Sequence, residues 1–302
     1  MTRPSDSSTM ISPVEDHFEF GKNWTHFLST LDDQRIADAT RSVQSLLHTE
    51  SLAQKRFLDA GSGSGLFSLV AHCLGANVTS FDLDSNSVAC TRTLQDRYAP
   101  TAENWAILTG SLTDRAFLST LGQYDVVYCW GVAHHTGAMW TCIENLSELV
   151  QPGGSIVLAI YNDQAYVSKI WQGVKQLYQR LPRVLQPLYV AGIGTLTFLK
   201  RLSVTLLACL LRLVTLRNPL VPFLNWAHES QARGMHGWYD LVDWVGGWPF
   251  EVAAPEAIFR FMRDQGFTLQ ELTTCSGHGC NEYVFQRTED NPEPLRRSDD
   301  AA

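Results

Sequence analysis

Two adjacent histidines, His134 and His135, stand in the segment YCWGVAHHTGAMW, directly after an apolar run. An imidazole titrates near neutral pH, so it can take the proton that an oxygen or nitrogen loses when it attacks an electrophile. The same position also suits a turn histidine that caps a helix starting near Gly137. The residues around the pair indicate whether these histidines act as a general base or only form a turn.

A glycine-rich turn lies some seventy residues before the histidines, in LDAGSGSGLFSLVA. Gly61, Gly63 and Gly65 separate an apolar run ending at Asp59 from a helical pattern. Glycines let the backbone turn tightly and approach a ligand at the carboxyl edge of a sheet. Asp82 ends the next apolar run, where a carboxylate can bind both ribose hydroxyls of a nucleoside.

The elements that must position these residues alternate between strands and helices from about residue 56 onward. Buried strands are expected at 56–60, 77–82, 105–110, 124–130 and 154–161, and helices at 85–98, 139–150 and 255–267. Two further strands, 268–274 and 281–287, flank the segment CSGHGC as an antiparallel hairpin. This order predicts an α/β fold with a doubly wound parallel sheet and a terminal hairpin.

The glycine spacing distinguishes two kinds of nucleoside-binding fold. A dinucleotide-binding turn needs a third glycine where this chain has Leu66, which disfavours an NAD-dependent oxidoreductase. The G-x-G-x-G spacing, the preceding Asp59 and the terminal hairpin resemble the class I S-adenosylmethionine-dependent methyltransferases. The resemblance covers roughly residues 50–161 and 250–287 and implies a Rossmann-like methyltransferase sheet with S-adenosylmethionine as its cofactor.

The resemblance implies a set of cofactor-binding residues. The glycine turn is expected to lie along the methionine and ribose, Asp82 to bind the ribose, and Ser111 and Leu112 to flank the adenine. N-terminal helices of this family often cover the cofactor, so Phe20 and Trp24 either line the pocket or pack ordinarily. The expected cofactor-binding set is Asp59, Gly61, Gly63, Gly65, Asp82, Leu83, Ser111, Leu112, Trp130, Phe20 and Trp24.

The end of the fourth strand faces the transferred methyl group in this family. We expect His135 to act as general base and His134 to orient it or substitute for it. The segment is similar to that of the ubiquinone-type O-methyltransferases, where a Glu-His pair occupies the two positions and a further glutamate can help hold a cation. Because that further position is Gly131 here, no metal is predicted.

Two other segments supply candidate substrate residues. Tyr161 and Asn162 end the fifth strand, where a simple turn is equally allowed. Trp238, Tyr239 and Asp243 lie in HGWYDLVDWVGGWPFE, which reads either as a substrate wall or as an aromatic seam between an insertion and the sheet. In CSGHGC, the spacing of cysteine and histidine matches no structural zinc pattern.

Composition limits the partners and the compartment. The 302-residue chain has a net charge of −8, which argues against a nucleic-acid partner. Its seven cysteines form no CxxC pair, and the N-terminus lacks a secretory pattern, so a cytoplasmic protein is expected. Residues 161–235 carry +7 against −15 for the rest. Their apolar stretches, 184–199 and 202–211, are each too short to span a membrane.

These features predict five regions. They are an N-terminal tail with cap helices (1–50), a cofactor-binding core (51–160), a basic helical insertion after the fifth strand (161–249), a return to the core (250–288) and a disordered tail (289–302). The insertion either covers the acceptor site or lies on an anionic membrane through residues 184–217, and both suit an amphiphilic or isoprenoid-linked acceptor.

The expected activity is methyl transfer to a hydroxyl oxygen of a small molecule. Transfer to sulfur or nitrogen stays open, because a partly ionised thiol needs little help from His135. A cofactor-binding protein without turnover, which uses the insertion as an interaction surface, is the remaining alternative.

Overall fold

The computed structural model describes residues 28, 31–224, 237–277 and 279–289. It divides into two compact units, Met1–Ile170 with Trp248–Ala302, and Trp171–Gly247. The first contains the sheet and the second is helical, and we refer to them as the sheet unit and the helical unit. The predictions for Phe20, Trp24 and the tail beyond residue 289 fall outside the described residues.

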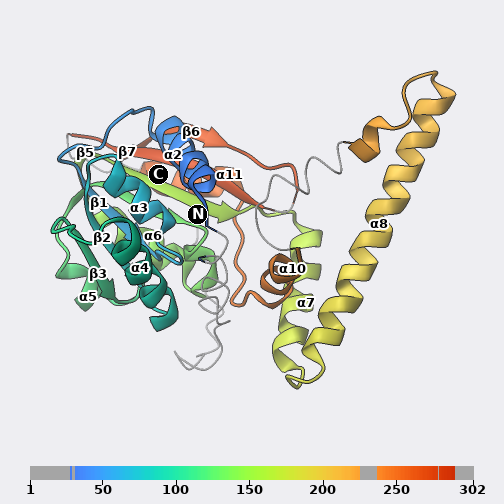
Figure 1. Cartoon of the computed structure of the whole chain (residues 1–302), viewed down its shortest axis with the longest axis horizontal. Coiled ribbons are helices and arrows are strands. Elements are labelled where there is room, and N and C mark those ends of the chain that lie inside the picture. The colour runs from blue at the N-terminus through green and yellow to red at the C-terminus, as the bar shows by residue number, and fades with distance from the viewer. Residues whose placement is uncertain (1–27, 29–30, 225–236, 278, 290–302) are drawn as a thin grey trace, which may run out of the picture. The chain divides into compact units, whose positions relative to one another are not determined.

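The sheet unit is built on a seven-stranded sheet (Figure 1). Its strands are β1 (Arg56–Ala60), β2 (Asn77–Asp82), β3 (Trp105–Thr109), β4 (Tyr124–Trp130), β5 (Val150–Tyr161), β6 (Phe267–Thr273) and β7 (Cys280–Arg287), in the order β3-β2-β1-β4-β5-β7-β6. Strands β1 to β5 are mutually parallel, and β7 runs antiparallel between β5 and β6. The predicted doubly wound sheet with a terminal hairpin is confirmed.

Helices cover both faces of this sheet (Figure 1). They are α2 (Asp33–Leu47), α3 (Leu66–Cys73), α4 (Ser85–Tyr98), α5 (Arg115–Ser119), α6 (Met139–Glu148) and α11 (Pro255–Asp264), with a short 3-10 turn, η1 (Ala133–His135). Side chains alternate along β4, so that Val126 and Tyr128 join one core cluster while Val127 and Cys129 join the other. This double burial explains the unbroken apolar run in the sequence.

Two element boundaries differ from the sequence prediction by three or more residues. Strand β5 begins at Val150, four residues early, because an irregularity in the pairing lets Val150 oppose Tyr124 before the regular register starts at Val126. Helix α11 ends at Asp264, where Gly266 adopts a left-handed φ of 82° and donates its N–H to the carbonyl of Arg263. Gly266 therefore stops the helix and lets β6 start at once.

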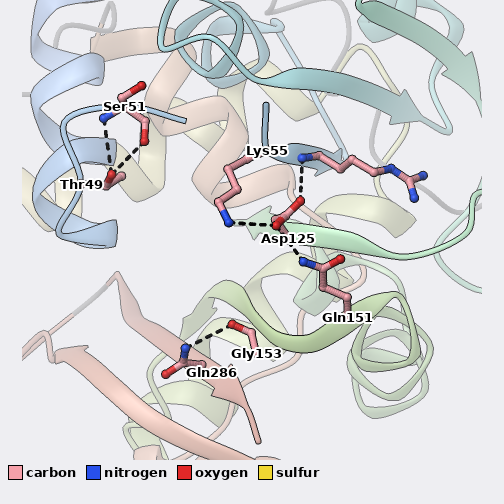
Figure 2. Close-up of polar contacts among 8 residues, drawn as sticks. Thr49, Ser51, Lys55, Asp125, Gln151, Gly153 and Gln286 are labelled. Atoms are coloured by element: carbon pink, nitrogen blue, oxygen red, sulfur yellow. Dashed lines mark hydrogen bonds and ion pairs between the residues drawn. The ribbon is translucent and has the colours of Figure 1, made fainter. Parts of the chain in front are cut away.

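The parallel arrangement brings the carboxyl ends of β1 to β5 to one edge of the sheet. At the opposite edge, Asp125 accepts hydrogen bonds from Lys55 Nζ (3.1 Å), the Arg56 N–H (2.9 Å) and Gln151 Nε2 (2.7 Å), as Figure 2 shows. Gln286 donates to the carbonyl of Gly153 at 3.1 Å. These contacts join the starts of β1, β4 and β5, so they support the sheet from the edge away from the glycine turn.

The helical unit contains most of α7 (Tyr166–Arg180), together with α8 (Gln186–Val214) and α10 (Gly237–Gly246). The two apolar stretches that the sequence separated are one helix of 29 residues, since Pro187 lies in the first turn of α8, where proline is tolerated. A Cβ on Gly194 would lie 2.6 Å from Leu241 Cδ2, so the absence of a side chain at Gly194 allows α8 and α10 to pack closely. Among the described helices, none is long and apolar enough to cross a membrane.

A buried lysine joins α7 to α10. Lys175 is fully buried, donates to the carbonyl of Trp244 and lies 4.8 Å from the centre of the Trp244 ring. Burial lowers the pKa of Lys175 to about 7, and the nearby carboxylate of Asp243 opposes that shift. Asp243 therefore takes part in the electrostatics of the helical core.

A directed chain of hydrogen bonds crosses the interior of the sheet unit. Trp105 Nε1–H donates to Ser80 Oγ (2.8 Å), Ser80 Oγ lies 2.6 Å from Ser68 Oγ, and Ser68 donates to Asp59 Oδ2 (2.5 Å). The chain links β3, β2, α3 and β1. Burial raises the pKa of Asp59 to about 7, while the bond from Ser68 opposes the rise.

This pKa predicts a pH-dependent stability. Between the unfolded value of 3.8 and about 7 the native state holds a proton on Asp59 that the unfolded chain has lost, so stability falls as pH rises through this window. Since one pKa unit corresponds to about 1.4 kcal/mol, the loss reaches a few kcal/mol. We expect Asp59→Asn to remove this loss, measured as the free energy of urea unfolding at pH 5 and pH 8 without cofactor.

Asp125→Asn is the matched control. Burial raises the pKa of Asp125, but the bonds from Arg56 and Lys55 outweigh it and the pKa is lowered. Its contribution is therefore lost as pH falls, and the control should weaken the protein at pH 8 rather than strengthen it. The same pH slope in Asp59→Asn as in the parent would show that Asp59 is ionised in the native state throughout.

Candidate cofactor and acceptor site

The turn after β1 is held in a single backbone conformation. Gly61, Gly63 and Gly65 have φ values of 84°, 53° and 82°. The N–H groups of Gly61 and Ser62 both donate to the carbonyl of Phe81 at 2.8 and 3.0 Å, and the Gly63 N–H donates to Asp82 Oδ2 at 2.9 Å. The end of β2 thus holds the turn after β1.

Asp82, the last residue of β2, places a carboxylate at the carboxyl edge of the sheet. Its Oδ1 accepts the N–H of Asp84 at 2.9 Å, so each carboxylate oxygen has one backbone donor. Burial raises the pKa of Asp82, and the N–H groups of Gly63 and Asp84 oppose the rise. A carboxylate has about four acceptor positions, so the group retains capacity for a ligand's hydroxyl groups.

Close contacts explain why glycine is required in the turn. A Cβ on Gly61 would lie 2.5 Å from Val132 Cγ1, and a Cβ on Gly65 would lie 2.9 Å from Thr91 Cα. Val132 belongs to the loop that follows β4, so the glycine turn and the histidine loop (Val132–Thr136) pack directly together. β1 and β4 are neighbours at the point where the strand order reverses, which is where open α/β sheets bind ligands.

The remaining predicted cofactor residues lie at the same edge in different environments. Leu83 and Trp130 expose 56% and 40% of their surfaces, and the Trp130 side chain lies close enough to Glu282 of β7 to oppose the rise that burial causes in the pKa of that carboxyl. Leu112 is 4% exposed, so its side chain belongs to the core. The Ser111 hydroxyl lies 2.8 Å from Thr113 Oγ1 within a local turn.

The two histidines form an aromatic cluster with Tyr161. The His134 ring is buried, with its centre 3.9 Å from that of Tyr161 and 4.5 Å from that of His135. His135 is half-buried, and the Tyr161 ring meets it edge-on at 5.3 Å. Phe250 adds a fourth ring, 5.4 Å from that of Tyr161.

A hydrogen bond sets the tautomer of His135. Its Nδ1 lies 2.7 Å from the carbonyl oxygen of Pro249, which can only accept. Nδ1 of the neutral ring therefore carries the hydrogen, and Nε2 keeps its lone pair. This is the form that a general base needs.

The segment Pro249–Glu251 packs against the histidine loop. The Glu251 N–H donates to the carbonyl of His134 at 2.9 Å. The Glu251 carboxylate accepts the Met139 N–H at 3.0 Å, at the start of α6, while Ala138 at the N-cap makes no side-chain bond. Glu251 therefore caps the N-terminal turn of α6.

Sequence reasoning missed Pro249 and Glu251. Both stand in the segment that predicts either a substrate wall or an aromatic seam, more than a hundred residues from the histidines. The cap and the tautomer are both set across this separation, and no spacing rule connects such positions. The acid directly following the WPF triplet was the available signal.

The other predicted substrate residues differ in where they lie in the structure. Tyr161 joins the histidine cluster. The Asn162 side chain donates a hydrogen bond to the carbonyl of Cys275 (3.2 Å) and accepts one from Asn281 Nδ2 (3.1 Å). These bonds anchor the hairpin loop. Asp243 belongs to the helical unit, and the side chains of Trp238 and Tyr239 lie outside the described residues.

The described part of the chain brings together no group of three or more His, Cys, Asp or Glu side chains that could hold a metal ion. His278 of the hairpin loop is not among these residues.

Comparison with known proteins agrees with this geometry. Residues 58–156 match the family described as "Methyltransferase domain". In fold, the chain is similar to magnesium protoporphyrin IX methyltransferase from Synechocystis PCC 6803 with bound SAH, with a TM-score of 0.50 at 14% identity, covering 84% of this chain and 83% of that one. It is also similar to PKMT2 from Rickettsia typhi in complex with AdoHcy, with a TM-score of 0.51 at 12% identity, covering 85% and 54%.

Residues 58–156 therefore match a methyltransferase domain, and the sheet unit has a fold similar to that of S-adenosylmethionine-dependent methyltransferases. The predicted fold is confirmed, and the matches agree with the predicted family and cofactor. Among sequence relatives, the chain is similar to ubiquinone biosynthesis O-methyltransferases. It is 31% identical over 134 residues to that of Pseudomonas aeruginosa strain UCBPP-PA14, covering 44% of this chain and 56% of the relative. It is 31% identical over 136 residues to that of Cupriavidus pinatubonensis, covering 44% and 52%. The chain thus spans just over half the length of these curated relatives.

The two left-handed glycines Gly65 and Gly131 provide a matched test of the turn. Both have φ near 80°, but a Cβ on Gly131 meets nothing within 4 Å, whereas one on Gly65 meets the Thr91 backbone. We expect Gly131→Ala to cost about 1–2 kcal/mol of unfolding free energy from backbone strain alone. Gly65→Ala should cost roughly 2–5 kcal/mol, because overpacking adds to the strain.

Urea unfolding followed by far-UV circular dichroism measures both costs. Equal costs for the two variants would show that the turn relaxes away from α4, and the close packing described above would then not constrain it.

Proposed function

We propose that the protein transfers a methyl group from S-adenosylmethionine to a hydroxyl oxygen of a small amphiphilic molecule, with His135 as the general base. The observation that carries the proposal is the bond from His135 Nδ1 to the carbonyl of Pro249. It leaves Nε2 as an acceptor in the loop that packs against the glycine turn.

The residues at the carboxyl edge fit the cofactor. Asp82 offers a carboxylate to the ribose hydroxyls, and the rigid turn allows close approach of the methionine portion. Leu83 and Trp130 expose apolar surface at the ends of β2 and β4, which suits an uncharged base. When bound, the cofactor supplies an electrophilic methyl group on a positively charged sulfur.

His135 supports the step that an oxygen acceptor requires. A neutral hydroxyl is a weak nucleophile, so its proton must leave as the oxygen attacks. Nε2 of His135 accepts that proton, and the bond to Pro249 then stabilises the protonated ring. His134 and Tyr161 position the His135 ring by packing against it.

The acceptor class and the compartment complete the proposal. The similar O-methyltransferases of P. aeruginosa and C. pinatubonensis act in ubiquinone biosynthesis, which supports a hydroxyl acceptor that is amphiphilic or isoprenoid-linked. All seven cysteines are free thiols, which supports a reducing, cytoplasmic compartment.

Asp82→Asn tests the cofactor site. Loss of the charge should weaken S-adenosylhomocysteine binding by roughly 10- to 100-fold, because a hydrogen bond to a charged group contributes about 1.5–3 kcal/mol. Isothermal titration calorimetry measures the affinity. The parent should hold S-adenosylhomocysteine and not NAD.

Asp84→Asn is the control for this experiment. Asp84 lies two residues away and caps α4 by accepting the Asn86 N–H, a role that asparagine can also perform. The control should bind S-adenosylhomocysteine as the parent does. Parent-like affinity in Asp82→Asn would remove the ribose assignment.

His135→Gln tests the general base. Turnover of a hydroxyl acceptor should fall by about 10²- to 10⁴-fold, while the affinity for S-adenosylhomocysteine changes little. The rise of parent kcat with pH, which reports deprotonation of the base, should disappear in the variant. Labelled S-adenosylmethionine with an extract of acceptors, followed by mass identification of the product, provides the assay.

His48→Gln is the matched control, because His48 is an exposed surface residue paired with Glu271. Its turnover should equal that of the parent. If His135→Gln retains full turnover and the product carries the methyl group on sulfur, the acceptor is a thiol and the proposal of oxygen transfer is wrong.

A further inference from the structure

Helix α8 exposes an apolar face. Six leucines share this face at helical spacings, and each exposes more than half of its surface: Leu196, Leu199, Leu206, Leu207, Leu210 and Leu213. We call this set the leucine face. Val190 and Thr205, on the other side of the helix, are 1% and 8% exposed. The buried and exposed sides are therefore distinct.

The neighbouring helices of the unit contact α8 near its N-terminal end. Tyr189 donates its hydroxyl to the carbonyl of Val174 in α7, and Gly194, on the side away from the leucine face, packs against Leu241 of α10. The C-terminal half of α8 extends beyond both helices (Figure 1). Within the described part of the helical unit, the leucine face is thus left at the surface.

The charge around this face has a single sign. Residues 164–228 include eight lysines and arginines and no aspartate or glutamate, although the whole chain has a net charge of −8. Lys200 and Arg201 lie near the middle of α8, Arg212 lies in its last turn, and Arg217 follows three residues after its end. Such a segment favours an anionic partner.

Charge also distinguishes between occupants of the leucine face. Two copies packed face to face would bring their lysines and arginines together, which opposes association. A bilayer with anionic lipids supplies acyl chains for the leucines and phosphates for the cations. Lys200, four residues after Leu196 and seven before Leu207, flanks the leucine face, so its long stem lets its charge reach the headgroups while the helix lies flat.

We propose that α8 binds the surface of an anionic lipid bilayer, with the leucine face inserted among the lipids and the helix axis along the membrane plane. A transverse helix would place Lys200 and Arg201 near the centre of the bilayer, which is costly. This surface site does not depend on methyl transfer, so either proposal can fail without the other.

Vesicle flotation of the full chain tests the site. The parent should float with vesicles that mix phosphatidylcholine and phosphatidylglycerol, and at least about tenfold less with phosphatidylcholine alone. Binding should weaken as salt is added, because screening shortens the reach of the surface potential. A parent that floats with neither vesicle, or equally with both, would overturn the proposal.

Two variants separate the apolar and electrostatic parts. Leu206→Gln, Leu210→Gln and Leu213→Gln together should reduce binding to anionic vesicles by at least about tenfold, because acyl contacts supply much of the binding. Lys200→Glu with Arg201→Glu should give a similar loss, because each basic residue near the surface contributes roughly fivefold. The second variant leaves the leucines in place, so it tests the proposal even if the first fails to fold.

Phe259→Gln with Leu272→Gln is the matched control, since both residues are 38% exposed apolar groups of the sheet unit. It should bind vesicles as the parent does. Analytical sedimentation without lipid measures the oligomeric state and tests the competing explanation, a dimer that buries the leucine face. If the parent is a dimer and the three-glutamine variant is a monomer, the leucine face belongs to a second copy and the membrane proposal is wrong.

Discussion

The hydrogen bond from the Gly63 N–H to Asp82 connects the ends of β1 and β2, and the rest of the site depends on it. It holds a turn whose glycines all have left-handed φ values, and it orients the carboxylate of Asp82, which we propose binds the ribose. The turn can pack against Val132 only because Gly61 has no side chain. In this way one contact fixes the cofactor edge and places the histidine loop beside it.

The histidine loop depends on a segment that reaches it from far along the chain. The carbonyl of Pro249 sets the tautomer of His135, and Glu251 binds both the His134 carbonyl and the start of α6. The chain enters this segment directly from α10 of the helical unit. The residues that set the tautomer of His135 and cap α6 therefore follow the insertion in sequence, although they belong to the sheet unit.

Buried ionisable groups stabilise the two units in different ways. In the sheet unit, Asp59 ends a chain of hydrogen bonds that begins at Trp105. In the helical unit, Lys175 lies on the Trp244 ring near Asp243. Burial disfavours the charged form of both groups, so it raises the pKa of one and lowers that of the other. Each unit thus has its own pH-sensitive core.

The sequence by itself determined the sheet, the glycine turn and the acid at Asp82, because strand burial and tight turns depend on residues close together in the chain. It also located the histidine pair and the basic, leucine-rich insertion. Only the tertiary structure decided that α8 is continuous, that Asn162 anchors the hairpin loop and that Glu251 caps α6. Those outcomes depend on contacts between distant segments, and local patterns of residue type carry no record of which distant segments will meet.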